Sequence, residues 1–375
     1  MSSAVEFDSL YIHVPFCKNI CDYCTLYSVV ENSKEIRQQY LSKIHSELNT
    51  SIKQLDNLKT IFIGGGTPNA LSSGELEQLL RSIQVLKIPS EFTVECNPAS
   101  ITEEKLQLMQ DYGVNRLSFG GQSTSRKTRK VLGRRTGDVE LFKAIDLAQK
   151  FGFKRINVDL IYAVPGQTLA DWQYDVQQVL SRGIRHFSAY SLILEEGAEI
   201  TKRIKETDDD LAVEMYHLCE DLLKEAGLER YEVSNYAVPG EECRHNLGIW
   251  HGAKYLGLGP AAASFDGLLR WTQKADLKAW LNGEKAKLDE IPLKERVAEV
   301  LAFGFRTKMG WQKELLHSLY GSEVLNEYKD ILDKLVIQGL LEETASCIRA
   351  TEQGLLFADE IASVLIDYAQ ETMSS

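Results

Sequence analysis

The strongest constraint on the fold is a regular alternation of short β-rich runs with amphipathic stretches over the first half of the chain. The runs are apolar and rich in β-branched and aromatic residues, as buried strands are: LYIHV (10–14), TIFIG (60–64), EFTVE (91–95), NRLSF (115–119), RINVDLIY (155–162) and HFSAYSLIL (186–194). The stretches between them have helical periodicity: 34–54, 74–86, 103–112, 138–151 and 169–182. Such alternation produces parallel strands covered by helices. We therefore predict an α/β fold built as a full or partial (β/α) barrel.

The rhythm of the sequence changes after VPG at 238–240, and helical patterns dominate from residue 274 onward. At roughly 100–200 residues per domain, a chain of 375 residues is long enough for two domains. We predict a barrel domain at 1–240 and a mainly helical C-terminal domain at 241–375. The segment LVIQGLLEETASCIRATEQG (335–354) has the helix–turn–strand rhythm of a small winged-helix-like module.

Charge and composition argue against several classes of protein. The chain has 42 Lys and Arg against 54 Asp and Glu, and the net charge of −12 makes nucleic acid an unexpected partner. No stretch reaches the roughly 18 uninterrupted apolar residues of a membrane helix. The start, MSSAVEFDSL, lacks the apolar core of a secretory signal. A soluble, cytoplasmic protein is therefore expected.

Three of the seven cysteines form a C-x3-C-x2-C pattern directly after the first predicted strand: Cys17, Cys21 and Cys24. Clustered thiolates select zinc or an iron–sulfur cluster. A structural zinc site needs four ligands, and only His13 and the distant Cys96 are candidates for the fourth. Three thiolates leave one iron of a cubane [4Fe–4S] cluster open to a small ligand. We favour the cluster, and zinc or a ligand-free loop remains open.

Polar or glycine-rich residues follow the other predicted strands. Gly64–Pro68 follow the second strand, and Glu95 and Asn97 end the third. Gln122 follows the fourth strand, and Asp159 lies within the fifth. Because the carboxyl ends of parallel strands meet at one edge of a barrel, these residues predict a binding site there, together with the cysteines.

At this level of detail the sequence resembles the radical S-adenosylmethionine (radical SAM) superfamily, through CKNICDYC (17–24) and GGGTP (64–68). A fuller match is to the branch that contains the oxygen-independent coproporphyrinogen III dehydrogenase and its heme-chaperone relatives. The shared segments are LYIHVPFC (10–17), VECNP (94–98), NRLSFGGQS (115–123), LGRR (132–135), VDLIYAVPGQT (158–168), YEVSNYA (231–237), CRHNLGIW (243–250) and YLGLGPAAASF (255–265).

The resemblance implies a [4Fe–4S] cluster on the three cysteines and S-adenosylmethionine on its open iron. It implies that Tyr11 and Tyr23 flank the cluster loop and the adenine, and that Ala263 is a further contact. It places the methionine end of the cofactor at Gly65, Gly66 and Thr67, and its carboxylate and ribose near Glu95, Gln122, Arg134 and Asp159. An alternative for Arg134 is a solvated basic helix, shared with Arg126, Lys127, Arg129, Lys130 and Arg135.

Three features favour the heme chaperones over the dehydrogenase. Leu26 stands where the dehydrogenase has a fourth cysteine, and only ten residues precede Tyr11, where the dehydrogenase has a long extension. HNLGIW resembles the H-N-x-x-Y-W heme motif of the chaperones. His245 is then a candidate axial ligand of heme iron, and Trp250 a candidate contact to the porphyrin face.

The chain departs from the family at three positions. Ile249 replaces the tyrosine of the heme motif, Thr136 replaces a histidine, and Gly121 replaces a larger residue. Ile249 removes a hydroxyl from the expected heme site, so His251 and Cys243 are kept as alternative ligands.

The resemblance implies a heme chaperone that receives heme or porphyrin and delivers heme to apo-hemoproteins such as respiratory cytochromes. An electron donor is a further expected partner, and a dimer or a peripheral membrane contact through the acceptor is left open. The alternative is an enzyme that decarboxylates porphyrinogen propionates by radical oxidation, so catalysis remains an open question. A zinc-stabilised binding protein is the third class.

Overall fold

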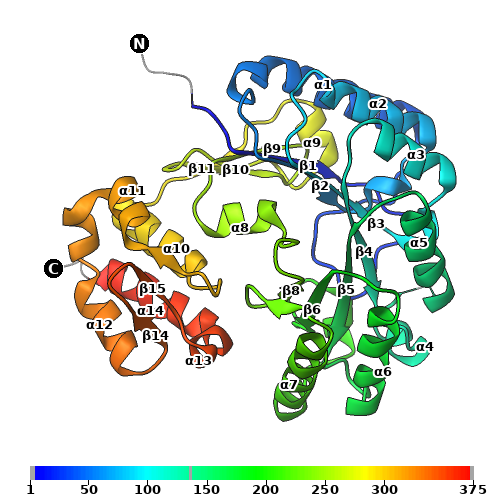
Figure 1. The fold of residues 1–375 in the computed structure, drawn as a ribbon. Coiled ribbons are helices and arrows are strands. Elements are labelled where there is room, and N and C mark those ends of the chain that lie inside the picture. The colour runs from blue at the N-terminus through cyan, green and yellow to red at the C-terminus, as the bar shows by residue number, and fades with distance from the viewer. Residues whose placement is uncertain (1–4, 135–136, 372–375) are drawn as a thin grey trace.

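One large sheet organises the protein (Figure 1). The computed structural model describes residues 5–134 and 137–371. The sheet has 12 strands in the order β12-β11-β10-β9-β1-β2-β3-β4-β5-β6-β8-β7. Its central strands from β9 (Tyr255–Leu258) to β6 are parallel: β1 (Ser9–Val14), β2 (Thr60–Gly65), β3 (Glu91–Cys96), β4 (Arg116–Gln122), β5 (Arg155–Tyr162) and β6 (His186–Ser191).

The sheet is an open, partial barrel, which confirms the predicted α/β class. Antiparallel strands extend it at both ends: β8 (Asn235–Ala237) and β7 (Glu229–Arg230) beyond β6, and β10 (Ala263–Phe265), β11 (Arg270–Thr272) and β12 (Lys287–Asp289) beyond β9. Among the described residues no pairing joins β7 to β12.

Helices cover the outer face of the sheet, and the five predicted ones are among them. They are α1 (Lys34–Ser51), α2 (Ser73–Ile83), α3 (Glu103–Asp111), α4 (Arg126–Val131), α5 (Asp138–Lys150), α6 (Leu169–Leu180) and α7 (Asp209–Glu225). Local signals fix where they begin. Ser72 and Glu75 form a capping box at α2, and the Thr102 hydroxyl accepts from Lys105 N at α3. Apolar side chains of strands and helices form one continuous core between the two layers.

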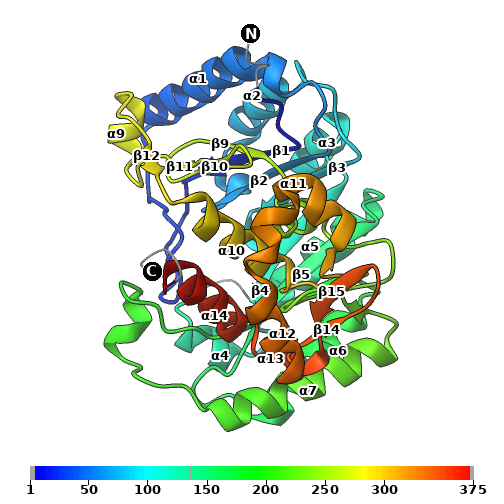
Figure 2. The same cartoon turned by 90° about the vertical axis from the view of Figure 1, so that its left-hand side faces the viewer.

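The C-terminal part lies on the opposite, concave side of the sheet (Figures 1 and 2). After α8 (Arg244–Trp250) and α9 (Leu277–Leu281) come α10 (Leu293–Gly304), α11 (Lys313–Asn326), α12 (Lys329–Ile337), α13 (Glu352–Leu356) and α14 (Ala358–Glu371). A small antiparallel sheet joins them: β13 (Trp311–Gln312), β15 (Cys347–Ala350) and β14 (Leu341–Glu343). The elements from α10 onward share a second apolar core around Phe305, Trp311 and Tyr328, whereas Leu277 and Trp280 of α9 belong to the core of the large sheet. This part is mainly helical, as expected.

The proposed boundary near residue 240 stays a prediction, as does the winged-helix assignment. β9 to β12 follow residue 240 in the chain and still belong to the large sheet. α12, β14 and β15 follow one another within the segment expected to have a winged-helix rhythm.

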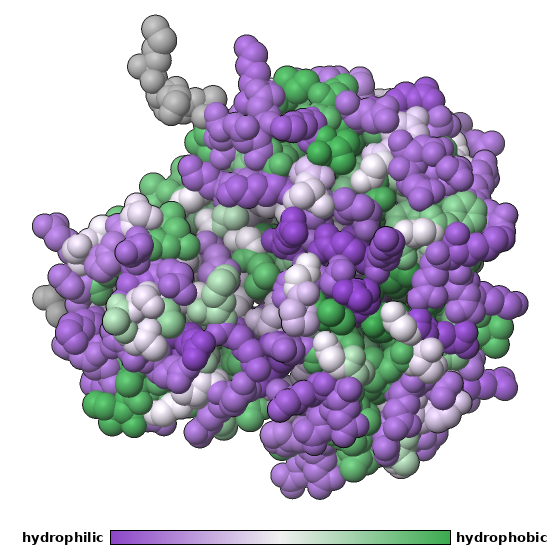
Figure 3. Space-filling model, viewed as in Figure 1, coloured by the Kyte–Doolittle hydropathy of each residue, from purple (hydrophilic) through white to green (hydrophobic). Residues whose placement is uncertain are grey.

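Apolar and polar residues alternate over the surface seen in Figure 3, and the apolar areas on that face are small and separated. Among the described residues, no helix is both long and apolar enough to cross a membrane.

A buried carboxylate attaches α8 to the sheet. Glu91, at the start of β3, accepts hydrogen bonds from Arg244 N at 3.0 Å and His245 N at 2.9 Å, and pairs with Arg155 Nη2 at 2.7 Å. Burial alone would raise the pKa of Glu91. The charge of Arg116 and the two N–H groups outweigh burial, so the pKa lies below its usual value and the group is ionised.

We therefore expect Glu91→Gln to lower the free energy of unfolding by about 3–5 kcal/mol, because it breaks a buried ion pair on one side. Urea unfolding monitored by circular dichroism measures the loss. Glu103→Gln, at an exposed ion pair with Lys150, is the matched control and should change stability by under about 1 kcal/mol. Equal stability of the two variants would contradict the role given to Glu91.

Candidate functional site

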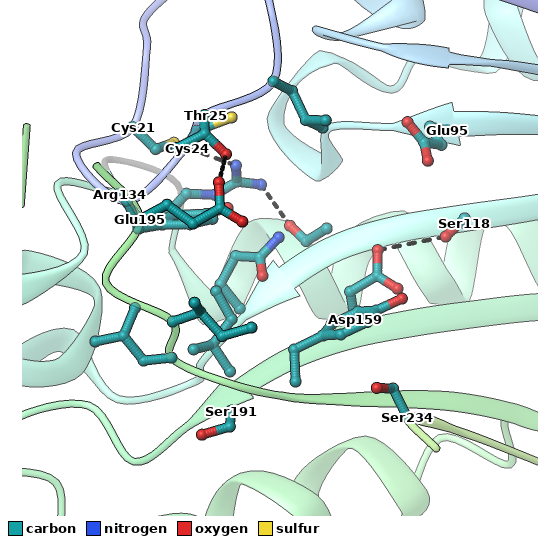
Figure 4. Close-up of a pocket in the computed structure, with 18 of the residues that line it drawn as sticks. Cys21, Cys24, Thr25, Glu95, Ser118, Arg134, Asp159, Ser191, Glu195 and Ser234 are labelled. Carbon is teal, nitrogen blue, oxygen red and sulfur yellow. Dashed lines mark hydrogen bonds between the residues drawn. The ribbon is translucent and has the colours of Figure 1, made fainter. Parts of the chain in front are cut away.

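A cavity of about 580 Å³ opens at the carboxyl ends of the parallel strands (Figure 4). The loop after β1, the glycines after β2, the ends of β3, β4 and β5 and the loop after β6 all line it. Residues of the C-terminal part close one side. Eleven of the fifteen predicted site residues lie in its wall: Cys17, Cys21, Cys24, Tyr23, Gly65, Gly66, Thr67, Glu95, Gln122, Arg134 and Asp159.

The three thiols come from one irregular loop whose ends are tied together. Cys17 N donates to Val29 O at 2.9 Å, and Val29 N donates to Pro15 O at 2.8 Å. All three cysteines are reduced and half-buried. Burial raises the pKa of the Cys17 and Cys24 thiols. Within the described ranges, no three His, Cys, Asp or Glu side chains are grouped so that they could hold a metal ion.

The glycine turn lets the β2 end approach the cysteine loop. Gly65 has φ of 106°, a left-handed conformation, and a Cβ there would lie 2.8 Å from the His13 ring. A Cβ on Gly66 would lie 2.9 Å from the Pro15 backbone and 3.0 Å from Cys17 Sγ. These positions therefore need glycine for the loop and the strand end to lie side by side.

Two buried carboxylates face the cavity from β3 and β5. Glu95 accepts from Gly65 N at 3.1 Å, and Asp159 accepts from Asn157 Nδ2 at 2.7 Å and from Ser118 Oγ at 3.4 Å. Burial, followed by the charge of Asp159, raises the pKa of Glu95 to about 7. Burial also raises the pKa of Asp159. A bound cation would relieve this repulsion.

Arg134 lies in the cavity wall, away from the solvated face of α4. Its Nη1 lies 3.6 Å from Cys21 Sγ, and its Nη2 donates to Gly120 O. Its Nε is buried and has no hydrogen-bond partner among the described residues. A guanidinium with a free donor beside the thiols can bind a carboxylate. Arg135 and Thr136 lie outside the described residues.

Four predicted residues do not line the cavity. The Tyr11 hydroxyl meets His13 Nδ1 at 3.1 Å, and burial followed by the charge of Glu95 raises the pKa of Tyr11. Ala263 lies in β10, closely packed against Gly257 of β9. His245 and Trp250 lie on α8.

His245 lies at the opposite end of β2 from the cavity. Its Nδ1 is 2.8 Å from the Thr60 hydroxyl, and its ring stacks on Phe62 at 4.9 Å. Thr60 begins β2 and Gly65 ends it, a separation of about 16 Å along the strand. Burial lowers the pKa of His245 to about 4, so the imidazole is neutral at pH 7. The structure therefore gives this histidine structural partners.

The structure explains one of the departures from the family. A Cβ on Gly121 would lie 2.8 Å from Leu141 Cδ2, so the neighbouring leucine fills the space that a larger residue would need. Ile249 is half-buried on α8.

Several cavity residues carry no motif that sequence reasoning could have used. The loop after β6 contributes Leu192, Ile193 and Glu195, which the position of the strand end could have suggested. Tyr216 of α7 and Arg306 after α10 had no such signal, because only the fold brings them to the cavity.

Comparison with known proteins agrees with this architecture. Residues 11–179 match the radical SAM superfamily, and residues 291–357 match the HemN C-terminal domain. The chain is similar in structure to the solved protein described as coproporphyrinogen III oxidase (HemN) from Escherichia coli, with a TM-score of 0.84 and 18% sequence identity. The match covers 98% of this chain and 92% of the HemN chain. Fold and cavity thus define a radical SAM protein.

Two curated relatives narrow this class. "Heme chaperone HemW" of Bacillus subtilis is 32% identical over 370 residues, 94% of this chain and 97% of the relative. Its Escherichia coli counterpart is 31% identical over 370 residues, 96% of this chain and 98% of the relative. The chain belongs to the HemW family within the radical SAM superfamily. Membership of this superfamily implies a [4Fe–4S] cluster and S-adenosylmethionine. The donor chemistry of the cavity wall suits both groups, since it supplies three thiols, a glycine turn and a guanidinium, although in the described residues the thiols are not grouped around a single ion position.

We expect Gly66→Ala to displace the cysteine loop, because the added methyl group meets the Pro15 backbone and Cys17. The variant should lose about 1–3 kcal/mol of stability and bind less iron and sulfide per chain after anaerobic reconstitution. Gly74→Ala, where nothing lies within 4 Å of the new Cβ, is the control. Full cluster loading of Gly66→Ala would show that the close approach is not needed.

Proposed function

We propose that this protein is a heme chaperone that holds a [4Fe–4S] cluster, S-adenosylmethionine and heme, and transfers heme to apo-hemoproteins such as respiratory cytochromes. The observation that carries the proposal is similarity to HemW proteins over nearly the whole length of both chains. The cavity supports it, because the three cysteines and eight of the predicted cofactor residues line one cavity.

In this proposal Cys17, Cys21 and Cys24 are the cluster ligands. Arg134 binds the carboxylate of S-adenosylmethionine through its free Nε, and Glu95 and Asp159 face its cationic groups. When bound, the cluster and this cofactor supply one-electron chemistry. Here they govern assembly or release of the cargo. The predicted contacts of Tyr11 with the cluster loop and the adenine, and of Ala263 with the cofactor, stay predictions.

The proposed location and partners of the protein rest on the same similarity to HemW proteins. We place the protein in the cytoplasm, with an electron donor for the cluster and no nucleic acid among its partners. The net charge of −12 agrees with the latter. A dimer, and a peripheral membrane contact through a membrane-bound acceptor, are further predictions.

The alternative function is oxidative decarboxylation of coproporphyrinogen III. The likeness to HemN at 18% identity supports a shared fold. Leu26, which stands where the dehydrogenase has its fourth cysteine, lines the cavity and is 59% exposed. An apolar side chain at this position cannot act as a further thiolate ligand.

An anaerobic assay separates the two functions. We expect reconstituted protein with reductant, S-adenosylmethionine and coproporphyrinogen III to form no protoporphyrin over many turnovers, by chromatography of the oxidised porphyrins. Loaded with hemin, the same protein should convert an apo-cytochrome to its heme form. Cys24→Ser should lose the cluster absorbance. Repeated turnover to protoporphyrin would overturn the chaperone proposal.

The role of His245 as heme ligand stays a prediction from the motif. For iron to bind its imidazole, the contacts with Thr60 and Phe62 would have to open. We expect His245→Ala to lower the free energy of unfolding by about 2–4 kcal/mol, because a buried ring and a hydrogen bond are lost. Denaturant unfolding measures this loss.

A hemin titration of His245→Ala, below its unfolding transition, tests ligation separately. The ligand prediction requires a loss of hemin affinity with the cluster absorbance intact. Unchanged affinity would remove His245 from the heme site, and the stability loss alone would then describe its role.

A further inference from the structure

One part of the cavity wall, called the outer end here, is formed by residues outside the predicted cofactor set. There the C-terminal part meets the barrel. Arg306 follows α10, Leu356 belongs to α13, Asp359 belongs to α14, and Tyr216 of α7 completes this end of the wall. Arg306 O accepts from Val233 N at 3.0 Å, which ties the two parts together.

Two buried polar atoms at this end lack a hydrogen-bond partner in the described part of the chain: Tyr216 Oη and Arg306 Nε. Buried donors are nearly always satisfied, because leaving one unpaired costs about 1–3 kcal/mol. Tyr216 and Arg306 line the same cavity, so a bound ligand that carries acceptor groups would satisfy both atoms. A hydroxyl and a guanidinium together suit a carboxylate.

The guanidinium of Arg306 is held in place and its protein partner is weak. Its Cζ lies 5.4 Å from the centre of the Trp250 ring, a cation–π contact. Its Nη1 pairs with Asp359 at 2.6 Å, but the Asp359 side chain is 91% exposed. A pair this exposed is worth about 0–1 kcal/mol, so a ligand carboxylate can replace it. The carboxylate of Glu232 accepts hydrogen bonds from Ser234 N and from the Asn235 side chain instead.

Exposed apolar side chains surround the same cavity. Ile20 and Leu26 come from the cysteine loop, Tyr190 and Ile193 from β6 and the loop after it, and Leu356 from α13. Their exposures run from 41% for Tyr190 to 67% for Ile193. Large apolar residues gathered at one opening are a sign of a binding site.

We propose that this outer end binds the tetrapyrrole cargo through a propionate. Arg306 and Tyr216 hold the carboxylate, and Ile193, Leu356 and Leu26 cover the apolar macrocycle. The proposal rests on the proposed heme-chaperone function and places its cargo away from His245. Trp250 acts as a positioning residue, because its ring supports Arg306. The HNLGIW segment thus contributes to the site without supplying an iron ligand there.

Hemin and its dimethyl ester test the proposal, since the ester replaces the two charged propionates with neutral methyl esters and leaves the macrocycle unchanged. Arg306→Gln and Tyr216→Phe should each weaken hemin binding about tenfold or more, as loss of a charge-assisted hydrogen bond does. Neither should change affinity for the dimethyl ester more than about twofold. Absorbance titrations of the full-length, cluster-loaded protein measure both, and the affinity for S-adenosylmethionine should stay unchanged.

Asp359→Asn removes the competing carboxylate and should raise hemin affinity several-fold, a gain that a purely structural role of Arg306 does not predict. Arg182→Gln and Tyr174→Phe, at residues that do not line the cavity, are matched controls without effect. Hemin binding that is unchanged in the Arg306 and Tyr216 variants, or an equal loss for acid and ester, would overturn this inference alone. Failure of the unaltered protein to bind hemin would overturn the proposed function as well.

Discussion

The parallel register of β1, β2 and β3 sets the position of everything else. Ser9 pairs with Thr60, and Thr60 with Glu91, so these residues lie at one level at the amino ends of the strands. Val14 pairs with Gly65 at the other end. The same ladder therefore has two working edges: one attaches α8 through buried hydrogen bonds, and the other opens into the cavity.

The strands, and the cavity residues at the strand ends, could be predicted because they depend on local sequence signals. The run 155–162 coincides with β5, and the others agree within a few residues. Gly65 could be assigned because a left-handed turn and a close approach both require glycine. β10 to β12 could not be placed, since each has only three residues and gains its position from pairing with a distant neighbour.

The two buried carboxylates of the cavity wall destabilise each other's ionised form. Glu95 and Asp159 are buried in one wall, and each raises the free energy cost of ionising the other. Arg134 does not neutralise them by direct contact, because the bonds it makes go to Cys21 and the Gly120 carbonyl. A ligand that carries positive charge would relieve the repulsion. S-adenosylmethionine has both an ammonium and a sulfonium, so its charge complements this wall.

The HNLGIW segment shows that a sequence motif can identify residues of interest without giving the role of each one. His245 and Trp250 are five residues apart on one short helix, yet the fold gives them different surroundings. The histidine faces the amino end of β2, where Thr60 and Phe62 satisfy it. The tryptophan faces Arg306, which lines the cavity. Glu91 holds the helix that carries both. The helix is therefore anchored at its start to the amino ends of the strands and supports a cavity-lining arginine at its end, so it connects the two edges of the sheet.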